Sequence, residues 1–155
     1  MIEYQFSAET CTASERYQKI LGLAREELEL LQQAVFTEPD DQTAWWYHRF
    51  IVASFMEPLP ELSWEESVED VEPYMELLQE EADNMRELIE AEDRQCKWGL
   101  LALYMLLGKL ISASKKLGLE DENDLDGWNM ECNECLDTLI EIDPDRVNRY
   151  ESMKS

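Results

Sequence analysis

The side chains best suited to acid–base chemistry are carboxylates in the middle of the chain. Glu80, Glu81, Asp83 and Glu87 lie within two helical turns of one another. Acid–base catalysis needs such groups in a cleft that shifts their pKa values. A run of acidic residues on an amphipathic helix more often forms its solvated face, so we expect these four side chains to face water.

Metal or redox chemistry would involve the cysteines. Cys132 and Cys135 have the C-x-x-C spacing of half a zinc site or of a redox pair, and the other two cysteines are Cys11 and Cys96. A zinc site needs further ligands, and no second paired spacing accompanies the lone His48. A thioredoxin-type motif needs a βαβ context. We therefore predict core or surface thiols and no metal bound by this chain.

His48 and its neighbour Arg49 are better explained by packing than by catalysis. A general base needs partners that the sequence does not place near His48, so we expect a hydrogen-bonded structural or interface histidine. A buried guanidinium must be compensated, so Arg49 is expected to pair with a carboxylate inside the fold. Contact with a partner protein is the alternative for Arg49.

Helices must position these groups, because helical spacing is the dominant pattern. The chain has 155 residues, 45% of them hydrophobic, with five Gly and five Pro. No useful segment alternates with period two, so the predicted fold is all-α. Helices are expected over residues 23–37, 42–55, 65–91, 95–115 and 129–141, with a short one after Pro144 and a lead-in helix broken by Gly22. Asp40 or Asp41 is the expected N-cap of the second helix, and Pro73 is expected to restart the third.

Two of these helices have a recognisable apolar stripe. The expected buried residues of the first are Leu23, Leu28, Leu31, Ala34 and Val35. Those of the third are Val68, Val71, Met75, Leu78, Ala82, Met85 and Leu88.

The charge of the chain excludes several classes of partner. With 13 basic and 36 acidic residues the formal net charge is −23, which disfavours nucleic acids and anionic membranes. A solvated acidic surface is the simpler interpretation, and a face for a basic partner is the alternative. The start of the chain lacks the pattern of a signal peptide, and no apolar run is long enough to span a bilayer. We expect a cytoplasmic protein.

Three stretches share one layout of apolar helix, acidic turn and a second helix bearing an aromatic residue. They are residues 35–45, 88–98 and 140–150, and their aromatic residues Trp45, Trp98 and Tyr150 lie 53 and 52 positions apart. A helix pair cannot bury its apolar face alone, so such repeats stack. Trp45 and Trp98 are expected to be packing wedges between the pairs, and stacking on a ligand is the alternative.

Residues 37–50 are more specific. Their run from Thr37-Glu38-Pro39 to Tyr47-His48-Arg49-Phe50 resembles the repeat of protein prenyltransferase α subunits, most of all those of Rab geranylgeranyltransferase (type II). Residues 97–101, and residues 142–146 together with Arg149 and Tyr150, resemble later parts of the same subunit. The resemblance extends over about residues 27–153 and implies its C-terminal half.

The resemblance implies a crescent of helical hairpins that wraps a separate β subunit. That β subunit would hold the catalytic zinc and transfer geranylgeranyl to C-terminal cysteines of Rab GTPases, which an escort protein presents. No position here matches the α-subunit lysine and tyrosine motifs that approach the diphosphate, so no catalytic residue is expected. The residues expected to be structural or to contact the partner are Trp45, Tyr47, His48, Arg49 and Trp98.

The prediction is thus a single helical-repeat domain over residues 1–155. It comprises a poorly defined lead-in (1–22) and three helix pairs (23–55, 65–116 and 129–154). Its expected role is an α-subunit fragment of Rab geranylgeranyltransferase, inactive alone, with no cofactor of its own. The alternatives are a non-enzymatic helical-repeat interaction module and a farnesyltransferase-type α subunit, the latter disfavoured by residues 41–49.

Overall fold

The structure, a computed structural model, describes residues 13–57, 68–119 and 123–154. In these ranges every regular element is helical and there is no strand, which confirms the all-α prediction. The elements are α2 (Ala13–Thr37), α3 (Gln42–Phe50), the π-helical turn η1 (Ile51–Phe55), α4 (Val68–Ala91), α5 (Lys97–Leu117), α6 (Leu125–Ile142), the 3₁₀ turn η2 (Pro144–Arg146) and α7 (Val147–Met153).

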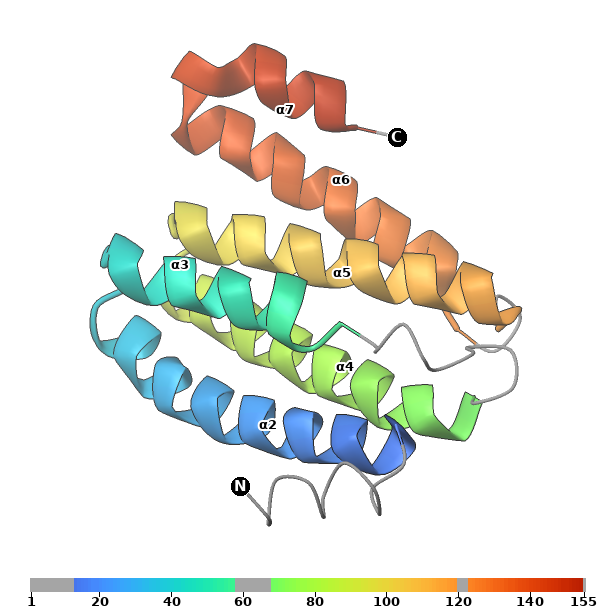
Figure 1. The fold of residues 1–155 in the computed structure, drawn as a ribbon. Helices are drawn as coiled ribbons and strands as arrows, with labels where there is room; N and C mark the ends of the chain where they lie inside the picture. Colours follow the sequence, from blue (N-terminus) through green and yellow to red (C-terminus); the bar gives the residue numbers. More distant parts are fainter. Residues whose placement is uncertain (1–12, 58–67, 120–122, 155) are drawn as a thin grey trace.

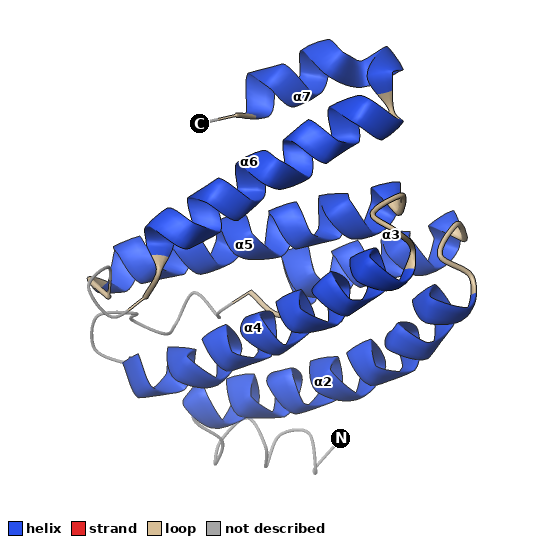
Figure 2. Ribbon diagram, turned by 180° about the vertical axis from the view of Figure 1, so that it is seen from behind, coloured by secondary structure: helices blue, strands red, loops and turns tan. Residues whose placement is uncertain are grey.

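The helices form stacked hairpins (Figure 1). Successive helices pack as the pairs α2–α3, α4–α5 and α6–α7, and the stack continues through contacts of α2 with α4, α3 with α5, and α5 with α6. In Figure 1 the array runs from α2 at the bottom to α7 at the top, with α3 in front of α4; Figure 2 shows α4 from the opposite side. This arrangement confirms the predicted hairpin fold, whereas the extent of the domain over residues 1–155 stays a prediction.

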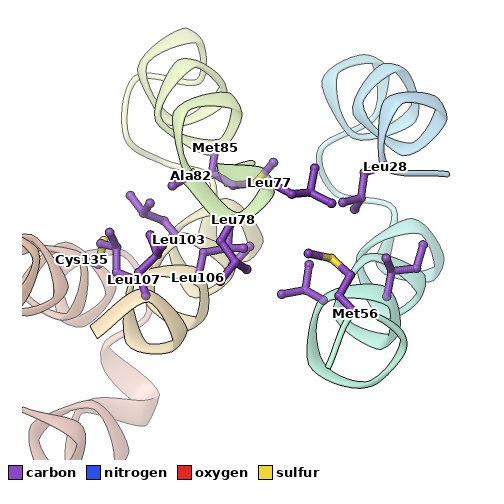
Figure 3. Close-up of a cluster of buried hydrophobic side chains, with 14 of the residues drawn as sticks. Leu28, Met56, Leu77, Leu78, Ala82, Met85, Leu103, Leu106, Leu107 and Cys135 are labelled. Atoms are coloured by element: carbon purple, nitrogen blue, oxygen red, sulfur yellow. The ribbon is translucent and has the colours of Figure 1, made fainter. Parts of the chain in front are cut away.

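The core is centred on α4 and α5 (Figure 3). Leu78 and Leu106 are fully buried where these helices meet, Leu28 and Met56 cover one side, and Cys135 of α6 covers the other. The apolar composition of α5 follows from this position, because the helix is contacted by α3, α4 and α6. All of the predicted α4 stripe from Val71 to Leu88 is buried; the side chain of Val68 lies outside the described part.

The first helix differs from its prediction. Helix α2 starts at Ala13 and continues through Gly22, which is exposed and does not break it. Gly costs a helix only about 1 kcal/mol, less than the packing of the helix can supply. Leu23 is 55% exposed and Ala34 is exposed, so both were wrongly assigned to the core. The true stripe is Tyr17, Leu21, Ala24, Leu28, Leu31 and Val35.

The spacing explains that error. Residues of the true stripe follow one another at three or four positions, which keeps them on one helical face. Leu23 lies two positions after Leu21 and is therefore turned about 200° from it. Apolar character alone did not distinguish the two faces.

The second helix has the predicted extent but changes its winding. Asp41 is the N-cap and accepts a hydrogen bond from the Thr43 amide at 3.0 Å, as predicted. The segment 51–55 is π-helical, with the Met56 amide donating to the Ile51 carbonyl at 2.9 Å. The Tyr17 hydroxyl donates to the Met56 carbonyl at 2.6 Å in the buried interior, which ties the end of this turn to α2.

The later helices also shift at their ends. Helix α4 continues through Pro73, so the expected restart is wrong; its expected start at residue 65 lies outside the described residues. Helix α5 starts at Lys97 behind a Cys96 cap and ends at Gly118, whose φ of 70° suits a C-cap glycine. Helix α6 starts at Leu125, four residues earlier than predicted, because Asp124 caps the Gly127 amide. None of the described helices is long and apolar enough to cross a membrane.

The packing gives a direct stability prediction. Replacing Leu106, fully buried between α4 and α5, by Ala should lower the free energy of unfolding by about 2–5 kcal/mol through lost burial and a residual cavity. Leu30→Ala is the matched control, because Leu30 is 66% exposed and should change stability by less than about 0.5 kcal/mol. Urea unfolding followed by circular dichroism measures both; equal losses would contradict the assigned core.

Candidate functional site

A groove is formed between helices from all three hairpins. It encloses about 710 Å³ and is lined by residues of α3, α5, α6, η2 and α7. We call this hollow the groove. It collects four of the five residues singled out from the sequence, namely Trp45, His48, Arg49 and Trp98. Tyr47 is not among its lining residues.

Trp45 anchors α3 to the turn before it. Its indole Nε1 donates to the Pro39 carbonyl at 2.7 Å, and its side chain is only 4% exposed. Its ring meets that of His48 edge-on, with centroids 5.7 Å apart. Trp45 is therefore a buried packing residue, in keeping with its predicted role as a wedge.

His48 joins α3 to α4 by a buried hydrogen bond. Its Nε2 lies 3.0 Å from Oε2 of Glu81, and the two side chains are 2% and 5% exposed. Asn84 donates to the other Glu81 oxygen at 3.2 Å, so both carboxylate oxygens have a partner. The hydrogen bond predicted for His48 is therefore present, and it links α3 to α4 in the interior.

Glu81 is the residue that the sequence interpretation missed. Glu80, Asp83 and Glu87 face solvent as predicted, but Glu81 does not. Its position carries the signal: it follows Leu78 by three residues and precedes Met85 by four, which places it on the buried stripe of α4. A buried carboxylate requires hydrogen-bonding partners, and the lone histidine supplies one.

Arg49 does not pair inside the fold, contrary to expectation. It is exposed, and none of the carboxylates in the described part of the chain forms an ion pair with it. The helix explains the difference, because Arg49 is one position after His48 and is therefore turned about 100° away from α4. It lies on the wall of the groove instead.

The outer face of α3 is aromatic and exposed. Trp46 is 73% exposed, Phe50 52% and Tyr47 43%. Tyr47 stacks on Phe50 with centroids 6.2 Å apart, and Phe50 contacts Phe55 at 6.5 Å. Exposed aromatic groups of this kind characterise protein-interaction surfaces.

The second repeat places its tryptophan differently from the first. Asp93 and Arg94 make the turn with positive φ values of 53° and 61°, and the Cys96 sulfur caps the Gly99 amide at 3.4 Å. Trp98 is only partly buried and lines the groove. The Lys97 ammonium lies 4.9 Å from the centre of its ring, a cation–π contact.

The third repeat is anchored by a polar cluster around Asp143. The hydroxyl of the buried Tyr150 donates to this carboxylate at 2.6 Å, Arg146 binds it at 2.9 Å, and Lys97 lies 3.4 Å away. The Tyr150 hydrogen bond, followed by the contacts with Lys97 and Arg146, lowers the pKa of Asp143. Burial and the same hydrogen bond raise the pKa of Tyr150 to about 12.

The cysteines of the C-x-x-C pair are buried thiols. Burial raises the pKa of Cys132 to about 11 and that of Cys135 to about 12. Nucleophilic and redox-active cysteines have lowered pKa values instead. Among the described residues, no group of three or more His, Cys, Asp or Glu side chains is placed to hold a metal ion.

The fold and the groove together define the class of protein: an array of helical hairpins whose groove carries aromatic and basic groups. Comparison with known proteins makes the resemblance particular. The geranylgeranyl transferase type-2 subunit alpha of Schizosaccharomyces pombe is 32% identical over 138 residues, which cover 85% of this chain and 36% of that protein. The same subunit of Dictyostelium discoideum is 30% identical over 138 residues, which cover 89% of this chain and 36% of that protein.

These two similarities confirm the resemblance drawn from the sequence to α subunits of type 2 geranylgeranyltransferase. The chain spans little more than a third of the length of these relatives. No family model matches it, and no solved structure matches it.

The buried contact between α3 and α4 can be tested by substitution. Glu81→Ala leaves the His48 ring and the Asn84 amide without their acceptor and should cost roughly 1–3 kcal/mol of unfolding free energy. Glu81→Gln keeps an amide oxygen as acceptor and should recover much of that loss. Urea unfolding provides the measurement.

The neighbouring residue supplies the control. Glu80 pairs with Arg25 while 52% exposed, so Glu80→Ala should change stability by less than about 1 kcal/mol. Similar losses of unfolding free energy for Glu80→Ala and Glu81→Ala would show that the buried Glu81 contact stabilises the fold no more than an exposed ion pair does.

The Asp143 cluster predicts a titration shift. Tyr150→Phe removes the main cause of the lowered pKa, so the pKa of Asp143 should rise toward its ordinary value of 3.8. Because the folded-state pKa lies below the unfolded one, ionised Asp143 stabilises the fold above the unfolded value, and this stabilisation is lost as pH falls through the folded-state pKa. The free energy of unfolding of the variant should therefore depend less on pH in this acidic range than that of the unsubstituted chain.

Carboxyl-carbon NMR titration of Asp143 measures the shift directly. Tyr104→Phe is the matched control, because the Tyr104 hydroxyl donates to the Met153 carbonyl at 3.2 Å. It should leave the pKa of Asp143 unchanged. An unaltered Asp143 titration in Tyr150→Phe would refute the assigned hydrogen bond.

Proposed function

We propose that the chain serves as α-subunit scaffold for the β subunit of a type 2 protein geranylgeranyltransferase. The similarity to two α subunits over 138 residues supports the subunit role. The observation that supports binding of a partner protein is the exposed aromatic face of α3, formed by Trp46, Tyr47 and Phe50 beside the groove. An apolar surface of this kind is stabilised when a second protein covers it.

The chemistry of transfer would belong to the partner. In this proposal the β subunit holds the zinc and the isoprenoid diphosphate, and the acceptors are C-terminal cysteines of Rab GTPases presented by an escort protein in the cytoplasm. Bound zinc would favour the thiolate of the acceptor, the nucleophilic form of cysteine. Within the described part of the chain, Cys132 and Cys135 are buried with raised pKa values and His48 is bound to Glu81, so these groups support a scaffold rather than a catalyst.

A second candidate is an interaction module without a role in prenylation. The formal net charge of −23 supports this candidate, because an array of helical hairpins with such an acidic surface could hold a basic partner that has no link to prenylation. The identity of the bound protein distinguishes the two functions.

Binding to a type 2 geranylgeranyltransferase β subunit tests the proposal. The immobilised chain should retain the purified β subunit. Trp46→Ala should raise the Kd about tenfold or more, because exposed aromatic residues at interfaces are frequent hot spots. Met130→Ala is the control, since Met130 is 66% exposed on α6 and does not line the groove.

Transfer is measured in parallel with geranylgeranyl diphosphate and a Rab acceptor. The chain alone should transfer nothing. Activity without a β subunit, or no retention of the β subunit, would overturn the proposed scaffold role.

A further inference from the structure

The groove is basic, whereas the molecule as a whole is strongly acidic. The chain as a whole has a formal net charge of −23, yet the residues that line the groove include no Asp or Glu. They include five of the 13 basic residues: Arg49, Lys97, Lys109, Arg146 and Arg149. A basic hollow surrounded by acidic surface attracts carboxylates and orients the partner that bears them.

Two of the five cations have no acidic partner among the residues that the structure describes. Lys97 and Arg146 share Asp143, at 3.4 and 2.9 Å, and Lys109 pairs with Glu57. Arg49 and Arg149 are both exposed, and neither forms an ion pair with a residue in the described ranges. Each guanidinium is therefore available for a bidentate contact with a carboxylate.

The surface between these arginines is apolar. Trp98, Leu101 and Met105 of α5 line the groove and are only partly buried, and Trp46 borders it. Partly buried aromatic and aliphatic groups next to Arg are the usual composition of the centre of a protein interface. An occupant that uses the whole groove therefore carries an apolar side chain as well as negative charge.

The span of the groove selects an extended segment over a small anion. Arg49 lies on α3 and Arg149 on α7, and α5 lies between them, since it contacts α3 and its Tyr104 hydroxyl donates to the Met153 carbonyl of α7. Two successive helix packings separate axes by roughly 16–20 Å. A peptide of about five or six extended residues covers that length, whereas one phosphate or diphosphate does not. A second copy of the chain is disfavoured by repulsion between two charges of −23.

We infer that the groove binds an extended acidic segment of a partner protein. One carboxylate meets Arg49, a second meets Arg149, and an apolar side chain between them packs on Trp98 and Leu101. This deepens the proposed function, on which the identity of the partner as the β subunit rests. The chemistry of the groove is tested without that partner.

The first experiment uses a synthetic probe. A fluorescein-labelled peptide, Asp-Glu-Leu-Phe-Asp-Glu, is titrated with the 155-residue chain, and fluorescence anisotropy gives the Kd. We expect saturable binding that weakens as salt is added. The neutral peptide Asn-Gln-Leu-Phe-Asn-Gln tests whether the apolar side chains alone account for binding, and it should bind more weakly.

Charge-reversal variants locate the site. Arg49→Glu and Arg149→Glu should each weaken binding of the acidic peptide about tenfold or more. Lys115→Glu makes the same change of charge at an exposed position outside the groove and should weaken it far less. Circular dichroism verifies that the exposed substitutions preserve the helical fold.

Four results would overturn the inference. They are equally tight binding of the neutral peptide, equal effects of Arg49→Glu and Lys115→Glu, binding of inorganic diphosphate at the same site with the affinity of the peptide, and sedimentation of the chain as a dimer that the groove variants dissociate. In the last two cases the groove would belong to a small anion or to a second copy.

Measurement with the β subunit separates this inference from the proposed function. If the β subunit binds the chain and Arg49→Glu and Arg149→Glu bind it equally well, the inference fails and the scaffold function stands. If the acidic peptide binds with the expected dependence on these arginines but the β subunit does not bind, the groove chemistry stands and the scaffold function fails.

Discussion

The hydrogen bond between His48 and Glu81 is the constraint on which the surrounding arrangement depends. Both side chains are buried, and the contact joins α3 to α4 across 33 positions of sequence. A buried carboxylate without a partner is expensive, so α3 must keep the His48 face toward α4. This rotation of α3 directs Trp46, Arg49 and Phe50 away from α4, toward the groove and solvent. A structural contact thus determines which groups the molecule presents to a partner.

The three turns between paired helices are stabilised by different interactions. Trp45 bonds the Pro39 carbonyl, and Tyr150 bonds the Asp143 carboxylate. The middle turn instead relies on two residues with positive φ and a sulfur cap. Trp98 has no comparable bond among the contacts described and lies partly exposed in the groove. The repeat that departs from the pattern therefore supplies the apolar floor of the groove.

The separation of charge follows from the same architecture. Acidic residues occupy outward faces such as that of α4, where water screens them. Basic residues of α3, α5, η2 and α7 converge on the groove, whose lining includes no Asp or Glu. The excess of acidic residues disfavours nucleic acid and membrane partners. The net charge does not reveal, however, that the surface of the groove is locally basic. That surface and the α3 aromatics are together what a protein partner would meet.

The sequence by itself determined the helices, the paired layout and the resemblance to prenyltransferase α subunits. These features depend on residues within about four positions of one another, such as the Asp41 cap and the Leu78 to Leu88 stripe of α4. Only the tertiary structure decided that Glu81 is buried against His48, that Arg49 points away from the core and that Gly22 lies inside a continuous helix. The physical reason is that each of these outcomes depends on packing between helices. Helix α2 continues through Gly22 because its packing outweighs the cost of a glycine, whereas the positions of Glu81 and Arg49 depend on how one helix is rotated against another. Such rotation is set by contacts between residues far apart in the chain, which local spacing does not record.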